Sequence, residues 1–216
     1  MSEQGSIERK ILAQGLFPIG VDEVGKGCLA GPVYAASVEL DYAALAELPP
    51  KDIALIRDSK TLSTAQRQYI SGPIKECALR YKVGSASPRE IEELGISEAT
   101  FLAMRRSYQR MTSSNSILLI DGNRRIPRFR GLQQTVVKGD SLCYGIAAAS
   151  ILAKEARDDF MRHQSEAFPQ YGFDSHVGYG TKRHLEMIHK FGICDLHRRN
   201  FAPIRRQVEH GTHPSS

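Results

Sequence analysis

The chain has 216 residues, of which 41% are hydrophobic and 25% charged, a composition typical of a globular protein with one ample core. No segment approaches the roughly 18 consecutive apolar residues of a membrane span, and the first residues show no basic region followed by an apolar block, so neither a membrane span nor an export signal is expected. The four cysteines form no Cys-x-x-Cys pair, which argues against zinc and indicates free thiols in the cytoplasm.

The net charge is +5 and the sequence pI about 9.1, and the basic excess is concentrated in two segments. Residues 124–130 contain four arginines and no acid, and residues 182–206 contain seven lysines or arginines against Glu186 and Asp195. Such segments suit a polyanionic substrate such as nucleic acid, although a solvated surface has the same composition. Charge alone does not separate these two interpretations.

Strands come first in the predicted order of elements, and helices alternate with later strands. Residues 19–24 and 33–40 are predicted as paired strands, because apolar residues lead into and follow a glycine-rich turn. The later elements follow in this order: a helix that opens at a Ser63 capping box and runs to about residue 78, a strand over 81–86, a capped helix start at 87–90, a helix over 97–111, strands over 117–120 and 134–137, and helices over 143–161 and 182–191. This order predicts an α/β fold, in which helices cover one main layer of sheet.

Two adjacent carboxylates, Asp22 and Glu23, lie in the glycine-rich run of residues 20–27. Charge is costly beside a buried strand unless something neutralises it, and a divalent cation with oxygen ligands is the usual solution. Neighbours on a regular strand point to opposite faces, so both carboxylates reach one site only if the strand bends or ends there. Gly25 and Gly27 permit such a bend, and a backbone carbonyl could also serve as a ligand.

Asp121 and Asp140 are the further candidate ligands. Asp121 follows four apolar residues of a buried strand, where α/β sheets bind ligands, although Asp-Gly is also a common turn pair. Asp140 precedes the alanine-rich helix over 143–161, and could instead cap a helix. Four carboxylates balance two divalent ions, a combination that can activate water and stabilise a leaving oxygen in phosphoryl transfer.

Read in order, the motifs over residues 17–206 resemble those of bacterial ribonuclease HII, the type 2 ribonuclease H. The resemblance rests on the glycine-rich run of residues 20–33, on Asp58-Ser59-Lys60, Ile120-Asp121-Gly122 and Lys138-Gly139-Asp140-Ser141, and on C-terminal motifs at 168–173, 178–181 and 197–201. A collinear set of this kind is far more specific than any one of its motifs.

The resemblance implies a ribonuclease H-like fold, with a mixed central sheet flanked by helices. It implies a catalytic domain over residues 17–165, a small C-terminal helical extension over 166–206 that binds substrate, and a flexible tail over 207–216. The implied activity is endonucleolytic hydrolysis of the RNA strand of RNA–DNA hybrids, and incision on the 5′ side of single ribonucleotides in duplex DNA, as ribonucleotide excision repair requires. The products carry 5′-phosphate and 3′-hydroxyl ends.

The same resemblance assigns the site residues. The matched metal ligands are Asp22, Glu23, Asp121 and Asp140, which would hold two Mg²⁺ or Mn²⁺ ions during catalysis. Recognition of the 2′-hydroxyl, which distinguishes RNA from DNA, falls to Gly25-Lys26-Gly27 and Tyr179. Lys26 stands where the family pattern has arginine, so the charge is kept but the planar fork of donors is lost. Phosphate contacts are expected from Ser59, Lys60, Thr181, Lys182 and His184.

Two other classes of function stay open. Another ribonuclease H-like nuclease, such as the type 3 enzyme or a junction resolvase, is the first. A non-catalytic hybrid-binding module is the second, and the intact carboxylates argue against it, because a pure binder gains nothing from negative charge facing phosphates. The preferred interpretation is a cytoplasmic monomer whose partners are RNA–DNA hybrids and duplex DNA that contains ribonucleotides.

Overall fold

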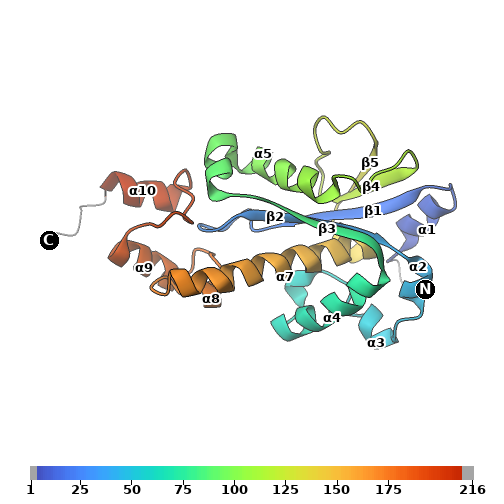
Figure 1. Cartoon of the computed structure of the whole chain (residues 1–216), viewed down its shortest axis with the longest axis horizontal. Helices are drawn as coiled ribbons and strands as arrows, with labels where there is room; N and C mark the ends of the chain where they lie inside the picture. The colour runs from blue at the N-terminus through green and yellow to red at the C-terminus, as the bar shows by residue number, and fades with distance from the viewer. Residues whose placement is uncertain (1–3, 211–216) are drawn as a thin grey trace.

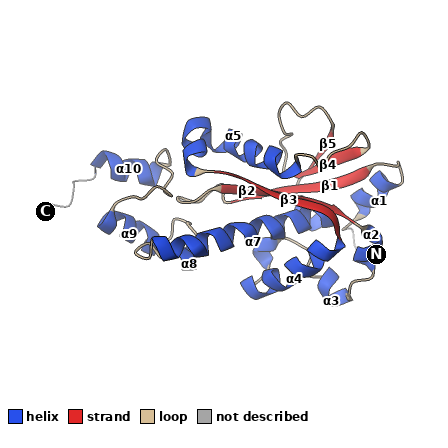
Figure 2. Ribbon diagram, viewed as in Figure 1, coloured by secondary structure: helices blue, strands red, loops and turns tan. Residues whose placement is uncertain are grey.

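A mixed sheet forms the centre of the computed structural model, which describes residues 4–210 of the chain (Figure 2). Its strands are β1 (Phe17–Val24), β2 (Val33–Leu40), β3 (Ala78–Ala86), β4 (Ser116–Asp121) and β5 (Leu132–Val136). They pair in the order β3-β2-β1-β4-β5. The pairs β1–β2 and β2–β3 are antiparallel, whereas β1–β4 and β4–β5 are parallel. The mixed central sheet predicted from the sequence is therefore confirmed.

Helices cover both faces of this sheet (Figure 1). α5 (Pro88–Tyr108) lies on one face, and α7 (Tyr144–Ala167) lies on the other together with α4 (Thr64–Cys77). The C-terminal helices α8 (Phe173–His176), α9 (Lys182–Phe191) and α10 (Ala202–His210) extend beyond one end of the sheet. The remaining short helices are α1 (Ser6–Leu12), α2 (Tyr42–Ala46), α3 (Pro50–Ile53), the 3-10 turn η1 (Ser59–Thr61) and α6 (Gly139–Leu142).

The predicted long elements are present, and their ends differ from the prediction by a few residues. The capping box at Ser63 is formed, since its hydroxyl accepts from the Gln66 amide while the Gln66 side chain accepts from the Ser63 amide. A second capping box opens α5 at Ser87. Gly95 interrupts α5 with a φ of 76°, at the position where the sequence predicts the helix to restart. Helix α1, before the first strand, is not predicted by the sequence pattern.

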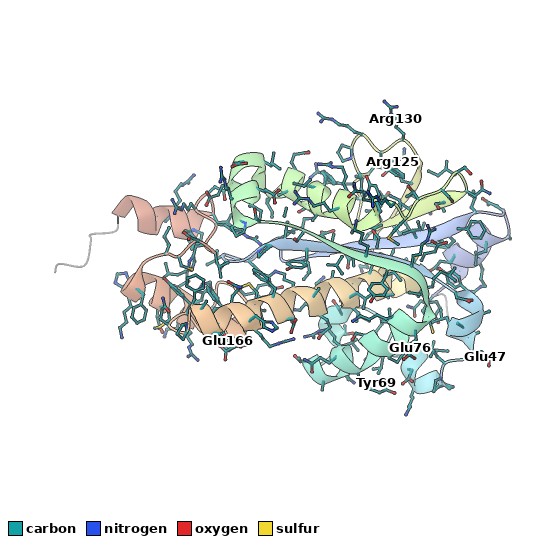
Figure 3. The ribbon with its side chains drawn as sticks, in the orientation of Figure 1. Glu47, Tyr69, Glu76, Arg125, Arg130 and Glu166 are labelled. Carbon is teal, nitrogen blue, oxygen red and sulfur yellow. The ribbon has the colours of Figure 1, made fainter. Side chains whose placement is uncertain are left out.

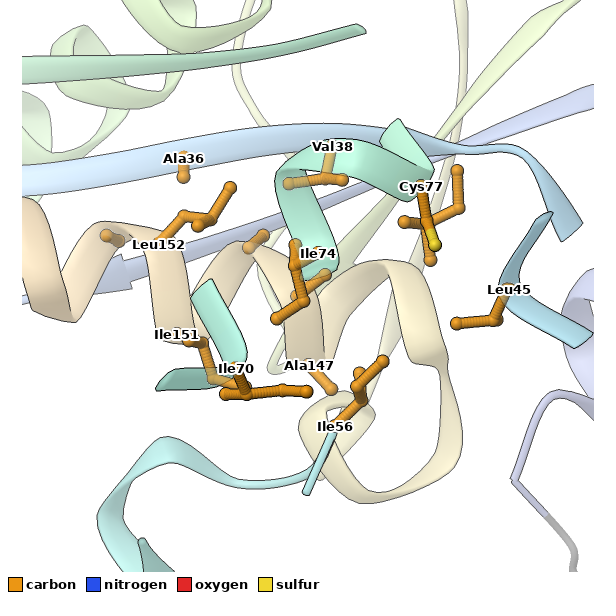
Figure 4. Close-up of a cluster of buried hydrophobic side chains, with 14 of the residues drawn as sticks. Ala36, Val38, Leu45, Ile56, Ile70, Ile74, Cys77, Ala147, Ile151 and Leu152 are labelled. Atoms are coloured by element: carbon orange, nitrogen blue, oxygen red, sulfur yellow. The ribbon is translucent and has the colours of Figure 1, made fainter. Parts of the chain in front are cut away.

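The main buried cluster lies between β2, α4 and α7 (Figure 4). Small residues of α7 let this helix approach the sheet closely, and the contact is closest at Gly20 of β1. A Cβ atom on Gly20 would lie 2.0 Å from the carbonyl carbon of Gly145. This contact between two glycines fixes the start of α7, and with it the preceding loop, against the central strand.

The residues that follow α7 pack against the loop after β1. The Arg198 guanidinium donates to the carbonyls of Gly31 at 2.9 Å and Lys26 at 3.0 Å. α7 ends at Ala167 and so crosses the predicted domain boundary at residue 165. α10 continues to His210, so a helix includes the first four residues of the tail predicted over 207–216, and the other six lie outside the described residues. Between residues 4 and 210, no helix is long and apolar enough to cross a lipid bilayer.

Candidate active site

The carboxyl ends of β1 and β4 bring two of the acidic candidates together. These strands are parallel neighbours, and Val21 of β1 lies opposite Ile120 of β4. The next residue on each strand is an aspartate, Asp22 on β1 and Asp121 on β4. Val21 and Ile120 pack into the apolar cluster beneath α5, so strand alternation directs both aspartates towards the α7 side.

Hydrogen bonds hold Asp22 in place, and only 6% of the residue is exposed. Its Oδ1 accepts from the Glu23 amide at 2.7 Å, and the Ser150 hydroxyl of α7 donates to the carboxylate. Ser150 Oγ lies in turn 3.0 Å from Ser59 Oγ. Burial raises the pKa of Asp22 well above its usual value, and the neighbouring charges of Glu23 and Asp121 raise it further.

The segment before α7 places Asp140 beside Asp121. The Gly139 amide donates to Asp121 Oδ1 at 2.8 Å, which ties this segment to the end of β4. Burial raises the pKa of Asp140, the negative charges of Asp121 and Asp58 raise it further, and the Lys60 ammonium opposes the shift. Asp140 therefore interacts electrostatically with Asp121. It also interacts with Asp58 and Lys60, which are not among the predicted metal ligands.

Glu23 lies on the opposite face of the sheet from Asp22. β1 continues regularly to Val24, so the bend that would turn both neighbours to one point is absent. Glu23 borders a small pocket against α5, and its Oε1 lies 2.6 Å from Lys26 Nζ. Across residues 4–210, no group of three histidine, cysteine, aspartate or glutamate side chains is arranged to hold a metal ion.

The donor set nevertheless fits hard divalent cations. The carboxylate quartet consists of Asp22, Glu23, Asp121 and Asp140. It offers only carboxylate oxygens, the donors that Mg²⁺ and Mn²⁺ prefer. Of the four carboxylates in the quartet, only Glu23 forms an ion pair within the described residues, and its partner is Lys26. Cations would relieve the mutual repulsion of these buried charges, and convergence of the quartet requires Glu23 to rotate away from Lys26.

Tyr179 lies against the glycine-rich loop after β1. The Leu29 amide donates to the Gly178 carbonyl at 2.9 Å, and the Tyr179 hydroxyl shares a hydrogen bond with the Cys28 thiol. The tyrosine is 39% exposed, and Lys154 Nζ lies 5.6 Å from the centroid of its ring. The two parts of the predicted 2′-hydroxyl sensor come from opposite ends of the sequence, and in space they form one surface.

Two buried arginines fix the shape of this loop. Arg157 of α7 donates to the Pro32 carbonyl at 3.1 Å, and Arg198 donates to the Gly31 carbonyl at 2.9 Å. Gly25 has a φ of 88°, and a Cβ atom there would lie 2.2 Å from Arg157 Nε. Glycine is required at this position because both its backbone conformation and its close contact exclude a side chain.

The five residues predicted as phosphate contacts fall into two groups. Three are exposed, namely Lys60, Thr181 and Lys182. Ser59 and His184 are buried instead, with 4% and 0% exposure. Ser59 faces Ser150, and the His184 ring stacks on that of His176 at 4.3 Å. Neither side chain faces solvent, so burial disfavours the phosphate contacts predicted for these two side chains, which stay predictions.

His184 belongs to a buried histidine cluster, formed by His176, His184 and His197, that supports Tyr179. His184 Nδ1 donates to the Tyr179 carbonyl at 2.8 Å, which leaves Nε2 to accept from His197 Nε2 at 3.2 Å. His197 Nδ1 accepts from the Cys194 amide at 2.9 Å. Both of these rings thus have one donor and one acceptor and are neutral, and burial lowers the pKa of both His184 and His197 to about 4.

Sequence reasoning missed several residues that contact the site. Ser150 is the one hydroxyl in a run of small residues that the sequence explains by packing alone. Asp58 belongs to a matched motif, but nothing in that motif indicates its proximity to Asp140. Arg124 contributes to the predicted basic segment, yet only the fold places it in a pocket beside Glu23.

Comparison with known sequences gives one consistent family. A sequence model described as ribonuclease HII matches residues 19–204. The ribonuclease HII of Nitrosomonas europaea is 48% identical over 211 residues, which cover 97% of this chain and 94% of the relative. That of Endomicrobium trichonymphae is 43% identical over 202 residues, 92% of each chain.

Solved structures share the fold. The ribonuclease HII from Archaeoglobus fulgidus, determined in a complex with PCNA, matches with a TM-score of 0.70 and 25% identity, over 86% of this chain and 95% of that one. Ribonuclease H2 from Pyrococcus horikoshii matches with a TM-score of 0.72 and 21% identity, over 89% and 97% of the two chains. A Bst-RNase HIII in complex with Mn²⁺ matches with a TM-score of 0.67 and 20% identity, over 90% and 70%.

Proposed function

The chain belongs to the ribonuclease HII family and is a metal-dependent endoribonuclease of the ribonuclease H type, and we propose that the carboxylate quartet is the place where its divalent cations bind and its reaction occurs. The observation that carries this proposal is the meeting of Asp22, Asp121 and Asp140. These come from three distant segments, and their charges act on one another in a buried setting. Bringing three carboxylates together, with Asp22 and Asp140 buried, is unfavourable without cations, so the arrangement is best explained by ions that the chain binds.

Asp22 and Asp121 supply ligand oxygens that neighbouring donors hold in place. Two bound divalent cations would activate water and stabilise the leaving oxygen. The Ser150 hydroxyl and the Gly139 amide each direct one carboxylate, Asp22 and Asp121 respectively. Because these donors come from ordered elements, the oxygens are preorganised for charge that develops during the reaction.

The surface beside the quartet supports discrimination between RNA and DNA. The loop of residues 25–31 and Tyr179 form one continuous surface, where glycine backbone can approach a ribose closely and the exposed part of the tyrosine ring can contact the neighbouring sugar. The fixed loop favours a substrate with a defined junction between DNA and RNA. The activity proposed for this chain is therefore cleavage of RNA–DNA hybrids and incision 5′ of single ribonucleotides in duplex DNA, with 5′-phosphate and 3′-hydroxyl products.

The remaining proposals follow from chemistry and composition. Mg²⁺ or Mn²⁺ is proposed as the ion, because the quartet offers oxygen ligands only. A cytoplasmic location is proposed on the support of four free cysteines, of which Cys28, Cys77 and Cys143 are buried. A monomeric state is proposed alongside it. Lys60, Thr181 and Lys182 are proposed to contact phosphates from the surface.

The test is a cleavage assay on duplex DNA with one internal ribonucleotide, in Mg²⁺, in Mn²⁺ and in chelator. Asp121→Asn and Asp140→Asn should each reduce cleavage by roughly 100-fold or more, since each removes a ligand from a centre that contributes several kcal/mol. Asp159→Asn, an exposed residue near the end of α7, is the matched control and should cleave normally. Unchanged cleavage by either quartet variant, or turnover in excess chelator, would refute the assignment. Poor cleavage of this substrate beside good cleavage of long hybrids would instead indicate type 3 specificity.

A further inference from the structure

A small pocket shares Glu23 and Asp121 with the quartet, and its arginine, Arg124, has no role in the proposed function. The pocket lies between the end of β1, α5 and the loop that follows β4, and its volume is about 100 Å³. Its polar lining includes Glu23, Lys26, Ser97, Asp121, Asn123 and Arg124. Pockets that enclose drug-sized molecules measure roughly 300–1,000 Å³, so this pocket suits a single charged group rather than a nucleobase.

Arg124 is the prominent cation of this pocket. Its Nη1 donates to Ser97 Oγ at 3.2 Å, and its Cζ lies 5.0 Å from the centroid of the Phe101 ring. These two contacts orient the planar guanidinium, whose remaining donors are left for a ligand. Within the described part of the chain, no carboxylate lies at ion-pair distance from Arg124. An arginine fixed by a hydroxyl and an aromatic ring, rather than by an acid, suits recognition of a phosphate.

The charge of the pocket depends on the quartet. Lys26 and Arg124 formally balance Glu23 and Asp121, so the pocket by itself has no excess of either sign. Cations bound at the quartet would neutralise the two carboxylates and release Lys26 from Glu23, to which it is now paired at 2.6 Å. The pocket would then present two positive charges next to the reaction centre, which favours an anion.

We propose that Arg124, assisted by Lys26, binds a backbone phosphate of the duplex other than the one that is cut. The inference rests on the proposed function, because it takes the scissile phosphate to lie at the quartet. It assigns to Arg124 a contact that anchors the nucleic acid on the α5 side of the sheet, across the quartet from Lys60. Phosphate contacts of this kind fix the register of a duplex without reading its sequence.

The test compares two arginines of the same loop. Arg130 lies towards the outer edge of the loop (Figure 3). Both arginines are exposed, but of the two only Arg124 lines the pocket. Arg124→Gln and Arg130→Gln remove the same charge, so any difference between them reports position rather than net charge. Both are introduced into the unmodified protein, so that the quartet keeps its ligands, and binding of a ribonucleotide-containing duplex whose scissile linkage resists cleavage is measured in Mg²⁺ by fluorescence anisotropy.

Arg124→Gln should raise the Kd about tenfold, which is the scale of one charge-assisted contact, and should lower the slope of log Kd against log salt by about one. Arg130→Gln should change Kd by no more than about twofold. Arg124→Lys keeps the charge but loses the planar fork of donors, so its Kd for the duplex should lie between those of Arg124→Gln and the parent. Thermal unfolding of each variant verifies that it is folded.

Methylphosphonate linkages, which remove one backbone charge at a time, then locate the phosphate. In the parent protein, one position outside the scissile linkage should weaken binding, and this loss should disappear in Arg124→Gln because the two changes remove the same contact. Equal Kd values for Arg124→Gln and Arg130→Gln, or an unchanged methylphosphonate profile in Arg124→Gln, would overturn the inference. A third result would also overturn it. Inorganic phosphate would raise the Tm of the parent but not of Arg124→Gln, while the Kd for the duplex would be the same in both proteins. The pocket would then bind a free anion rather than a backbone phosphate.

The cleavage assay on the unmodified protein separates the two levels of proposal. If the unmodified protein fails to cut the duplex, the proposed function is wrong, whatever the binding data show. If it cuts and Arg124→Gln binds like Arg130→Gln, only the phosphate contact is wrong.

Discussion

The hydroxyls of Ser59 and Ser150 lie 3.0 Å apart inside the protein, although 91 residues separate them in the chain. Ser150 donates to an oxygen of the Asp22 carboxyl group, so the single proton of Ser150 is used there. The Ser59 proton must therefore point at Ser150. The two serines form a directed chain of hydroxyls that links the motif of residues 58–60 to the carboxylate.

This chain of hydroxyls predicts the effect of removing either serine. Ser150→Ala should weaken Mn²⁺ binding or cleavage about 10–100-fold, the usual cost of losing a group that orients a metal ligand. Ser59→Ala should cost only a few-fold, because Ser150 keeps its own donor. Isothermal titration with Mn²⁺ measures the affinity directly. Ser114→Ala, at an exposed position, is the control, and equal affinities in all three variants would contradict the prediction.

Lys26 competes with cations for Glu23, so its removal should strengthen metal binding. The ion pair is short at 2.6 Å, but the Lys26 side chain is 52% exposed, and such pairs contribute at most ~1 kcal/mol. Lys26→Met should therefore raise Mn²⁺ affinity up to about fivefold, while it lowers duplex affinity. Thermal unfolding across a Mn²⁺ titration measures the first effect, with exposed Lys51→Met as the control. Weaker Mn²⁺ binding by Lys26→Met would show that the lysine assists the cation.

Lys26→Arg tests the departure from the family pattern separately. The change keeps the charge and adds a planar fork, so duplex affinity should change by no more than about one to two orders of magnitude. Anisotropy titrations with the same duplex compare the two forms. Identical binding and cleavage kinetics would show that the side chain does not contact the substrate.

The histidine cluster predicts how stability depends on pH. Burial lowers the pKa of His184 and of His197 to about 4, whereas in the unfolded chain each titrates near 6.5. Between these values the unfolded state binds more protons, so the free energy of unfolding should fall as the pH falls from about 6.5 to about 4. Above pH 6.5 the two groups are neutral in both states and add no slope.

Thermal unfolding from pH 7.5 to pH 4.5, a range set by these two values, measures this dependence. His184→Asn should lower the Tm at neutral pH, because it removes ring stacking on His176, and should flatten the decline towards acid. His189→Asn changes an exposed histidine of the same helix and should leave the decline unchanged. An equally steep decline in both variants would assign the acid sensitivity to other groups.

The contact of Gly20 with Gly145 predicts a large effect of one methyl group. Gly20→Ala would place a Cβ atom 2.0 Å from a backbone carbon, so the strand or helix must shift, at a cost of about 3 kcal/mol. Gly72→Ala is the matched control, because it lies within α4 and a Cβ atom there would meet nothing within 4 Å. Pro73 disfavours a helical backbone at the residue before it and offsets the usual gain of Ala over Gly, so that change should alter stability by no more than about 1 kcal/mol. Urea unfolding measures both changes, and similar values would contradict the predicted clash.

Local patterns predict much of this fold, because they depend on residues close in the chain. The capping boxes at Ser63 and Ser87 and the break at Gly95 are present where the sequence predicts them. The Asp22–Glu23 pair is different, because the sequence leaves its geometry open and only the uninterrupted β1 strand shows that the two side chains diverge. The burial of Ser59 and His184 could not be predicted for the same reason, since burial depends on distant segments that no local pattern contains.

The arginine that closes the loop after β1 is synthesised long after the loop itself. Arg198 binds the Lys26 carbonyl across 172 residues of sequence. A nascent chain on the ribosome contains β1 to β5 once residue 136 has been synthesised, yet the loop after β1 gains this support only once residue 198 has emerged. Premature termination anywhere before this arginine therefore yields a protein in which the quartet is encoded but its neighbouring loop is unsupported.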